Sequence, residues 1–206
     1  TERLLSEGHE VFGIDNINDY YDPNIKYKNL EILESYDSFT FKKEDIRDTR
    51  IIDEWEPDIV CHLASMAGVR YSIKNPKLYF DVNVNGFINI LEQCVKNKVK
   101  KIVYASSSSV YGLNKKLPFS EEDKIESCNS PYACSKLSME QIAKTYFQLY
   151  GMASIGLRFF TVYGPWGRPD MAIDKFLRGI HKQEKITKYG NGETSRDNTY
   201  VSDIIE

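Results

Sequence analysis

Short apolar runs rich in β-branched residues alternate along this chain with longer segments whose apolar side chains recur at helical spacing. The runs that predict strands cover residues 10–15, 38–45, 58–65, 100–109 and 153–160. The segments that predict helices cover residues 47–55, 76–97 and 131–149. Strands separated by helices predict an α/β fold whose parallel sheet is covered on both faces. Ligands of such a sheet bind at the carboxyl ends of its strands.

Both ends of the sequence are expected to be cut ends. The chain opens on Thr1, and TERLLSEGH is typical of the last two turns of a helix that ends near Gly8. The last residues, YVSDIIE, carry no terminating signal. In a dinucleotide-binding fold, a glycine-rich phosphate loop comes about 20 residues before an acidic strand end such as Asp15. We therefore expect that loop upstream of Thr1.

The composition excludes some classes of partner. A net charge of −3 predicts no nucleic-acid surface, and no apolar run approaches the roughly 20 residues of a membrane span. The four cysteines lack the close-pair spacing of metal sites, so we expect no metal, no disulfide framework, a reducing compartment and a cytoplasmic location. Cys61 and Cys94 lie in apolar runs and are expected to be buried. We interpret His62 as a core histidine with satisfied hydrogen bonds.

Three predicted strands end in residues that suit a nucleotide. At the first, Asp15 precedes Asn16, and an acidic residue there can bind ribose hydroxyls, although a plain Asp-Asn turn is favoured from the residues alone. At the second, Asp45 precedes Ile46, where a helix N-cap is an equally good interpretation. The third ends in small or apolar residues that allow a ligand to approach but fit an ordinary loop equally well, namely Leu63, Ala64 and Ser65.

The fourth predicted strand ends in four consecutive serines, Ser106 to Ser109, followed by VYG. One hydroxyl of the four could bind a substrate hydroxyl while the others satisfy backbone groups of the loop. For any single serine, the loop role is the better supported of the two from the residues alone.

A tyrosine and a lysine begin the last predicted helix, at Tyr132 and Lys136. A separation of four residues places both side chains on one face of a helix. The lysine ammonium and the helix N-terminus both favour the phenolate, which would make Tyr132 a general base near neutral pH. The same spacing occurs at Tyr111 and Lys115, where the intervening residues favour a turn, so spacing alone does not identify a catalytic pair.

Several motifs occur together and in a fixed order, namely LLSEGHEVFGIDNINDYYD, ASSSSVYG, SPYACSK, GLRFFTVYGPWGRPDMA and SRDNTYVSD. Through them the chain resembles the extended short-chain dehydrogenase/reductase family over nearly its whole length, and is most similar to the nucleotide-sugar epimerases that act on UDP-glucuronate at C4. The resemblance implies a Rossmann-like doubly wound sheet whose first strand and glycine-rich loop are missing here. It also implies an NAD-binding domain over 1–164 and the start of a substrate-binding region over 165–206. Mild departures from the family pattern occur at Ser65, Met66 and Ser202.

The resemblance implies NAD as the cofactor and a role for each catalytic candidate. Tyr132 would take the proton of the C4 hydroxyl, Lys136 would also hydrogen-bond the nicotinamide ribose, and Ser107 would hold the C4 oxygen. Hydride would leave C4 for NAD⁺ and return to the other face of a transient 4-keto sugar. The residues expected to bind the cofactor are Asp15, Asn16, Asp45, Ile46, Leu63, Ala64, Ser65, Tyr132 and Lys136.

The implied substrate is a nucleotide sugar, and UDP-glucuronate fits best. Ser108 and Ser109 stand where related dehydratases and decarboxylases carry carboxylates, so neither reaction is expected. Arg168 can bind the C6 carboxylate of a uronate in bidentate fashion, although a plain pair with Asp170 is the alternative. Arg196 aligns with a diphosphate-binding arginine of the family. The residues expected to bind the substrate are Ser107, Ser108, Thr161, Arg168 and Arg196.

Two alternatives stay open from the sequence. In one, the enzyme is an epimerase of another UDP-hexose or of a UDP-N-acetylhexosamine; in the other, the chain is a truncated, inactive remnant with a binding or structural role. The 206 residues alone are expected to bind NAD poorly, because loss of a central strand exposes apolar surface and unpaired backbone groups. A homodimer is also expected from the family. Residues assigned either to its interface or to the core are Phe87, Leu91, Ile142 and Tyr146.

Overall fold

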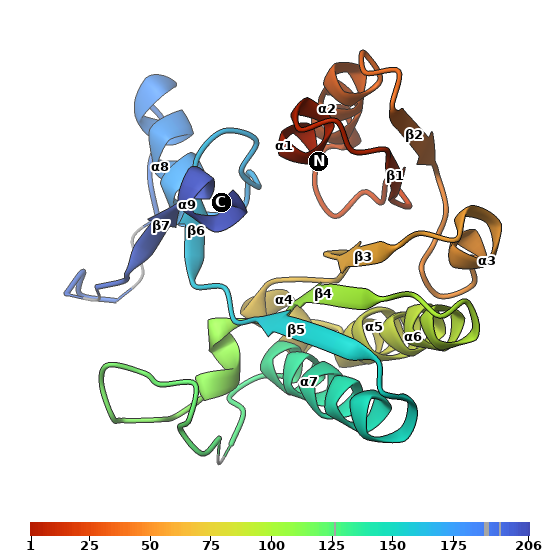
Figure 1. The fold of residues 1–206 in the computed structure, drawn as a ribbon. Coiled ribbons are helices and arrows are strands. Elements are labelled where there is room, and N and C mark those ends of the chain that lie inside the picture. Colours follow the sequence, from red (N-terminus) through yellow and green to blue (C-terminus); the bar gives the residue numbers. More distant parts are fainter. Residues whose placement is uncertain (126, 188–189, 194) are drawn as a thin grey trace. The chain divides into compact units, whose positions relative to one another are not determined.

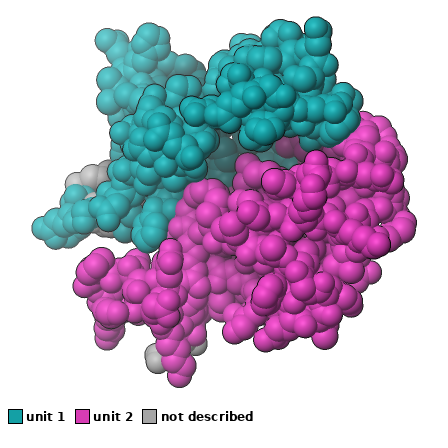
Figure 2. Space-filling model, in the orientation of Figure 1, with its two compact units in different colours: residues 1–13, 17–41, 160–206 teal, residues 14–16, 42–159 magenta. Residues whose placement is uncertain are grey.

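The computed structural model describes residues 1–125, 127–187, 190–193 and 195–206. The chain forms two compact units, coloured separately in Figure 2. Unit 1 consists of residues 1–13, 17–41 and 160–206, and unit 2 consists of residues 14–16 and 42–159. The expected start of a substrate-binding region near residue 165 stays a prediction.

Unit 2 is built on a parallel sheet with the strand order β3–β4–β5 (Figure 1). Its strands are β3 (Ile59–His62), β4 (Lys101–Ala105) and β5 (Ala153–Leu157). The register places Lys101 opposite both Ile59 and Ala153, so all three strands start together and their carboxyl ends lie at one edge. The predicted α/β fold with parallel strands is confirmed, and all five predicted strands exist, each shorter than its apolar run.

The helices of unit 2 bury their apolar side chains against this sheet. They are α3 (Ile51–Trp55), α4 (Val69–Lys74), α5 (Pro76–Tyr79), α6 (Gly86–Lys96) and α7 (Pro131–Tyr150), with a π-helical turn η1 (Phe80–Asn85) and a 3₁₀ turn η2 (Ser108–Tyr111). The core that they form with the sheet includes Phe87, Leu91, Ile102 and Met139, all fully buried. Phe87 and Leu91 are therefore core residues, and Ile142 and Tyr146 pack against that core while partly exposed.

Two of the three predicted helices are confirmed, and the third begins later than expected. The segment 76–97 is one helical stretch interrupted by η1, and 131–149 matches α7. In the segment 47–55, the helix α3 starts only at Ile51. The amides of Asp48 and Thr49 donate to the Asp45 carbonyl oxygen, at 3.3 and 3.0 Å, and form a turn there instead.

The start of α7 is fixed by its own sequence. The Ser130 hydroxyl accepts a hydrogen bond from the Ala133 amide at 3.1 Å, and Pro131 occupies the first helical turn, where its missing N–H costs nothing. At the other end, Gly151 adopts φ 68°, a left-handed conformation that ends helices. The N-cap fixes the turn that carries Tyr132, and Gly151 ends the helix.

Unit 1 holds two small two-stranded sheets and four helices among the described residues. Its elements, with β1 and β2 each reaching one residue into unit 2, are α1 (Glu2–Ser6), β1 (Val11–Ile14), α2 (Pro23–Leu33), β2 (Phe39–Lys42), β6 (Thr161–Tyr163), α8 (Ala172–His181), β7 (Asn198–Tyr200) and α9 (Val201–Ile205). Neither helix α2 nor helix α8 was predicted from the sequence. An available signal for α2 was Asp22 before Pro23, because the Asp22 carboxylate caps the Asn24 amide at 3.0 Å.

Two expectations about buried side chains need correction. Cys94 is buried as expected, but Cys61 is exposed because it lies on the opposite face of β3 from the buried His62. His62 is a core residue, yet its Nε2 atom has no hydrogen-bond partner among the described protein groups, so its hydrogen bonds are not fully satisfied. None of the helices within the described ranges is long and apolar enough to cross a membrane.

Candidate functional site

Lys136 is the buried cation at the centre of the candidate site. Only 1% of the residue is exposed, and its Nζ atom donates to the Ala105 carbonyl oxygen at 2.7 Å. This bond joins α7 to the carboxyl end of β4. Burial lowers the pKa of the Lys136 amine to about 7, since the low-dielectric interior disfavours the charged form. An amine with that pKa can give up or accept a proton near neutral pH.

Tyr132 lies one turn before Lys136 on the same face of α7. Its ring is partly buried and meets the ring of Tyr79 edge-on, with centroids 6.0 Å apart. The Tyr132 carbonyl oxygen accepts a hydrogen bond from the Ser135 hydroxyl at 2.8 Å. The predicted tyrosine–lysine pair therefore stands on one helix face at the edge where the strands of unit 2 end.

The serines after β4 all take part in local structure. Ser107 is buried, and its hydroxyl oxygen accepts from the Ser109 amide at 3.2 Å, which caps η2. The Ser108 amide donates to the Phe159 carbonyl oxygen at 2.9 Å, and the Ser106 hydroxyl donates to Glu140 at 2.5 Å. The cap of η2 uses only the acceptor side of Ser107, so it leaves the hydroxyl proton of that serine uncommitted.

Ser106, the first of these serines, binds an ion pair that was not predicted from the sequence. Glu140 lies one turn after Lys136, and its two carboxylate oxygens accept from Nε and Nη2 of Arg158 at 2.9 and 2.8 Å. The same guanidinium lies 5.0 Å from the centroid of the Tyr111 ring. The hydrogen bonds to the carboxylate raise the pKa of Arg158 above its ordinary value, so the guanidinium stays charged. The position of Glu140 four residues after Lys136 on the same helix was the signal in the sequence that could have identified this carboxylate.

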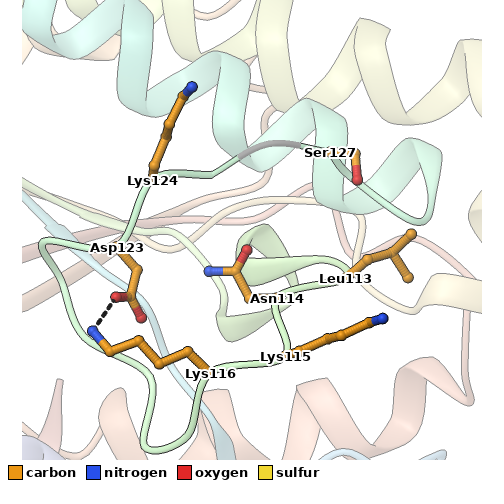
Figure 3. A pocket seen from close by; sticks show the side chains of 7 residues that line it. All are labelled: Leu113, Asn114, Lys115, Lys116, Asp123, Lys124 and Ser127. Atoms are coloured by element: carbon orange, nitrogen blue, oxygen red, sulfur yellow. Dashed lines mark hydrogen bonds and ion pairs between the residues drawn. The ribbon is translucent and has the colours of Figure 1, made fainter.

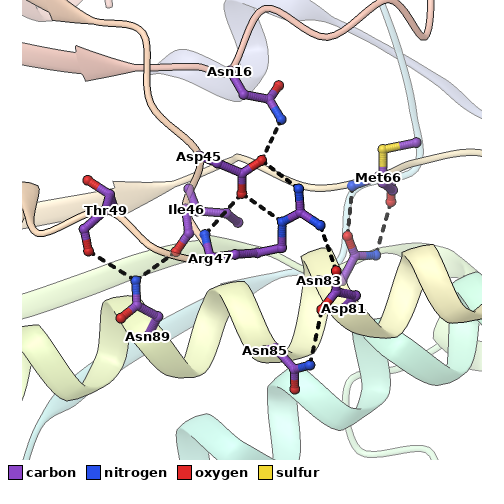
Figure 4. Close-up of polar contacts among 10 residues, drawn as sticks. All are labelled: Asn16, Asp45, Ile46, Arg47, Thr49, Met66, Asp81, Asn83, Asn85 and Asn89. Carbon is purple, nitrogen blue, oxygen red and sulfur yellow. Dashed lines mark hydrogen bonds and ion pairs between the residues drawn. The ribbon is translucent and has the colours of Figure 1, made fainter.

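The ends of β1 and β2 are joined by their predicted site residues. Figure 4 shows Asn16, Asp45 and Arg47 pointing toward one another. The Asn16 side chain donates to Asp45 at 2.8 Å, and Arg47 donates three hydrogen bonds to the same carboxylate through its amide, Nε and Nη2, at 2.9 to 3.0 Å. The guanidinium holds the pKa of Asp45 well below its usual range. Four donors use the acceptor capacity of this carboxylate.

Two further contacts tie the turn at residues 45–47 to the helical segment of η1 and α6. Arg47 donates a further hydrogen bond from Nη1 to Asp81 at 2.6 Å, which ties the turn after β2 to η1. Ile46 is a core residue, and its carbonyl oxygen accepts from the Asn89 side chain at 2.8 Å. Asp45 thus forms a turn with the Arg47 amide rather than the N-cap of α3, which corrects the N-cap alternative.

The residues after β3 lead into a loop that a buried asparagine holds. Leu63 is exposed, and Ala64 and Ser65 are partly buried. The next residue, Met66, exchanges two hydrogen bonds with the side chain of Asn83, at 2.7 Å through its amide and 3.0 Å through its carbonyl oxygen (Figure 4). Asn83 was not predicted from the sequence, because nothing in its position within a helical segment marks a partner 17 residues away.

Asp15 follows β1 directly, is partly buried and belongs to unit 2. The other predicted site residues lie in unit 1. Thr161 is the first residue of β6 and lies opposite Asn198 of β7. Arg168 donates from Nε and Nη2 to the two carboxylate oxygens of Asp170, at 2.9 and 3.0 Å, so the plain pair considered from the sequence does form. Arg196 is exposed and donates to the neighbouring Ser195 carbonyl oxygen at 3.1 Å.

The structure also contains a cavity outside the predicted site. It has a volume of about 400 Å³ and lies in the loop after η2 (Figure 3). Its lining residues are Leu113, Asn114, Lys115, Lys116, Asp123, Lys124 and Ser127. Lys115 lies in the loop after η2, whereas Tyr111 ends η2, so the second Tyr–Lys pair does not share a helix face. Across the described part of the chain, no group of three or more His, Cys, Asp or Glu could hold a metal ion.

Comparisons with known proteins agree with this geometry. The model of the NAD dependent epimerase/dehydratase family matches residues 1–206. The chain is 44% identical over 209 residues to a probable UDP-glucuronate 4-epimerase of Rhizobium meliloti, covering all of this chain and 61% of the relative. It therefore spans less than two thirds of that relative's length.

Two solved structures are similar throughout the chain. The UDP-glucuronic acid 4-epimerase of Bacillus cereus, in complex with UDP-glucuronic acid and NAD, matches with a TM-score of 0.93 and 34% identity, over 99% of this chain and 65% of that one. The UDP-N-acetylglucosamine 4-epimerase of Methanobrevibacter ruminantium M1, in complex with UDP-N-acetylmuramic acid, matches with a TM-score of 0.85 and 32% identity, over 98% and 64%. The resemblance seen in the sequence motifs is confirmed, and the chain belongs to the NAD dependent epimerase/dehydratase family.

Proposed function

We propose that the protein is an NAD-dependent 4-epimerase of a nucleotide sugar, with UDP-glucuronate as the substrate and UDP-galacturonate as the product. The observation that carries the proposal is the buried Lys136 amine, bonded to the end of β4 and one helical turn from Tyr132. A buried lysine beside a tyrosine at the carboxyl edge of a parallel sheet is a proton-transfer arrangement. The chain is similar to a probable UDP-glucuronate 4-epimerase and to a UDP-glucuronic acid 4-epimerase, and both similarities support epimerisation at C4.

The residues present fit an NAD cofactor. Asp15 directly follows β1 and suits the adenosine ribose hydroxyls, and the Asn16–Asp45 hydrogen bond joins the segments that follow β1 and β2. Because the Asp45 carboxylate already has four donors, we assign it to shaping this edge, with contact to the cofactor through the backbone of 45–46. The other proposed cofactor contacts are Leu63, Ala64, Ser65, Tyr132 and Lys136.

The chain's own residues would carry the proton transfers. When bound, NAD⁺ supplies the acceptor and later the donor of the hydride at C4. Tyr132 would remove the proton of the C4 hydroxyl and return it in the second half of the reaction. Lys136 uses one donor on Ala105, which orients its amine, and its remaining N–H groups would stabilise the phenolate. Ser107 would donate its uncommitted proton to the C4 oxygen.

The choice among sugars rests on unit 1. We propose that Thr161, Arg168 and Arg196 bind the substrate, together with Ser107 and Ser108, and that Arg168 meets the C6 carboxylate. One observation favours the alternative, an epimerase of a UDP-hexose without that carboxylate. The Nε and Nη2 atoms of Arg168 already bind Asp170, so a bidentate contact to a uronate would replace Asp170.

Steady-state assays of the intact protein test both parts of the proposal. Tyr132→Phe is expected to lower kcat at least about a hundredfold, the usual effect of removing a general base, without loss of NAD binding. Arg168→Ala is expected to lower kcat/KM for UDP-glucuronate about tenfold or more and to leave UDP-glucose turnover unchanged. Equal effects on the two sugars would favour the alternative substrate, and an active Tyr132→Phe variant would contradict the mechanism.

We also propose a homodimer and a cytoplasmic location. Helix α7 leaves Phe147, Leu149 and Tyr150 exposed near its end, an apolar surface suited to a second copy of the chain. Sedimentation of the intact protein tests this, with Phe147→Asp expected to give monomers. All four cysteines are free thiols, which suits a reducing compartment.

A further inference from the structure

Tyr79 is a fully buried tyrosine next to the candidate site, at the junction of α5 and η1. Its exposed fraction is 0%, and a buried phenol needs a hydrogen-bond partner for its hydroxyl. Its partners come from the loop that follows β3. The hydroxyl lies 2.7 Å from the carbonyl oxygen of Ala67 and 2.9 Å from that of Gly68, and its single proton serves both acceptors.

The peptide that Tyr79 holds has an unusual backbone conformation. Gly68 adopts φ 101° and ψ 114°, a region that L-residues rarely enter, and it forms the N-cap position of α4. Its carbonyl oxygen also accepts from the Ser72 amide at 3.3 Å. The Tyr79 hydroxyl therefore fixes the two carbonyls on either side of the point where the chain turns from the end of β3 into α4.

The ring of Tyr79 has a second contact, to the candidate general base. It meets the Tyr132 ring at an interplanar angle of 76°, with centroids 6.0 Å apart, the edge-to-face arrangement that aromatic pairs prefer. One turn later, Asn83 makes parallel connections, because its side chain binds Met66 and also donates to the Ser135 hydroxyl at 2.9 Å. The two side chains together connect the loop of residues 66–68 to the first turns of α7.

We propose that Tyr79 is a positioning residue that couples the loop 66–68 to the catalytic tyrosine. Its hydroxyl holds the loop that continues the proposed cofactor contacts Leu63, Ala64 and Ser65, and its ring holds Tyr132. The inference rests on the proposed function, because it concerns the placement of a cofactor-binding segment and a general base. Two contacts of one side chain thus serve two different steps, cofactor binding and proton transfer.

Two variants of Tyr79 separate these contacts in the intact protein. Tyr79→Phe removes only the hydroxyl, so the NAD⁺ dissociation constant is expected to rise about tenfold, the effect of one buried hydrogen bond, while kcat at saturating NAD⁺ stays within about twofold. Tyr79→Leu also removes the ring contact, so kcat is expected to fall about a further tenfold. Tyr146→Phe is the matched control, because it removes a hydroxyl that donates to the Glu92 carboxylate at the surface, at 2.9 Å.

Calorimetric titration with NAD⁺ and initial-rate assays, both well below the melting temperature, give the readouts. If Tyr79 has a merely structural role, Tyr79→Phe lowers the melting temperature but has the same NAD⁺ dissociation constant as Tyr146→Phe. That result would overturn the coupling to the loop. Equal kcat values for the Phe and Leu variants would overturn the coupling to Tyr132. If the unaltered protein neither binds NAD⁺ nor epimerises a UDP-sugar, the proposed function itself is wrong, and the inference falls with it.

Discussion

Burial of Lys136 brings the pKa of its amine close to neutral pH, which suits proton transfer, but burying the charged form destabilises the folded state. The Lys136 amine is almost completely buried, and the one backbone carbonyl that it binds does not replace the lost hydration, so its pKa lies at about 7. His62, buried nearby, responds in the same way, because burial and then the charge of Lys136 lower its pKa to about 3. Both groups remain neutral over part of the pH range in which they would be charged in an unfolded chain.

The stability of the protein should therefore depend on Lys136 in a defined pH window. Below pH 7 the folded state carries a charged, buried amine and the full penalty is present. Between pH 7 and about 10.5 the unfolded chain binds more protons than the folded one, so stability rises with pH. Lys136→Met removes the penalty, and the free energy of unfolding at pH 6 is expected to rise by about 2 kcal/mol, since each pKa unit corresponds to about 1.4 kcal/mol and the lost bond to Ala105 offsets part of the gain.

Urea unfolding at pH 6, 7, 8 and 9 measures this effect. The Met variant should show a flatter rise of stability with pH than the unaltered protein, and it should be inactive. Lys144→Met, an exposed position on the same helix, is the control and should change neither quantity. A loss of stability in Lys136→Met at pH 6 would contradict the assignment of a buried, costly charge.

The sequence could predict single residues only where a local pattern carried the information. Tyr132 and Lys136 stand one helical turn apart, so their common face follows from helix geometry. Tyr79 and Asn83 bind backbone groups of another segment, and such contacts leave no mark in the sequence. The position of Glu140 one turn after Lys136 was visible, but its partner Arg158 was not. Ser107 was predicted for chemistry, yet its visible contact is a cap of η2, and both roles use the same hydroxyl.

At the scale of elements, the loop after β4 depends on a glycine. Gly112 ends η2 with φ 56° and ψ −114°, and a Cβ atom there would lie 1.9 Å from the carbonyl oxygen of Ser127. Both the backbone conformation and the close approach exclude a side chain. Because η2 begins at Ser108, this turn holds the segment that follows Ser107 against the chain near residue 127.

Gly112→Ala is therefore expected to cost about 3 kcal/mol or more, because strain of the backbone and a clash with main-chain atoms add together. Gly151→Ala is the matched control. Gly151 also has a positive φ, 68°, but no atom lies within 4 Å of the position that an added Cβ would occupy, so only the left-handed penalty of about 1–2 kcal/mol is expected. Chemical denaturation of both variants measures the difference. Equal losses would show that the loop moves away from Ser127 at little cost.

Elements were predictable where hydrophobic period and length agreed. All five expected strands and the long helices 76–97 and 131–149 carried clear apolar patterns, and the structure contains them. Helix α2 was missed because its sequence mixes charge with weak apolar periodicity. Helix α8 is strongly amphipathic, so its helical pattern was present in the sequence and was overlooked. The π-helical turn η1 was also missed, since a local insertion of this kind leaves the apolar pattern of the surrounding helix nearly unchanged.

At the scale of the whole molecule, the proposed roles divide between the two units. The proposed cofactor contacts at 15–16, 45–46, 63–65, Tyr132 and Lys136 all belong to unit 2, as do the proposed substrate contacts Ser107 and Ser108. The other proposed substrate contacts belong to unit 1, namely Thr161, Arg168 and Arg196. In the sequence the two predicted sets overlap, because Ser107 and Ser108 precede Tyr132 and Lys136. The sequence could not show that residues 1–13 and 17–41 form one unit with residues 160–206, because that association depends on tertiary contacts alone.

This division predicts how ligands change amide hydrogen exchange in the intact protein. A ligand that binds only the folded state stabilises it, by about 2.7 kcal/mol at a concentration of 100 times its dissociation constant, and slows exchange through unfolding up to about a hundredfold. NAD⁺ should therefore protect the strand ends of unit 2, at 63–68, 105–111 and 130–136, before any effect reaches α8. Added UDP-glucuronate should then protect the segment 161–170.

NADP⁺ at the same concentration is the control for the first step. The carboxylate of Asp15 would repel its 2′-phosphate, so protection of unit 2 should be clearly weaker than with NAD⁺. Equal protection by the two dinucleotides would exclude Asp15 from the ribose site, and protection that begins in unit 1 would show that the cofactor binds elsewhere. Because each outcome maps to a different set of peptides, one exchange experiment tests the cofactor site and the substrate site separately.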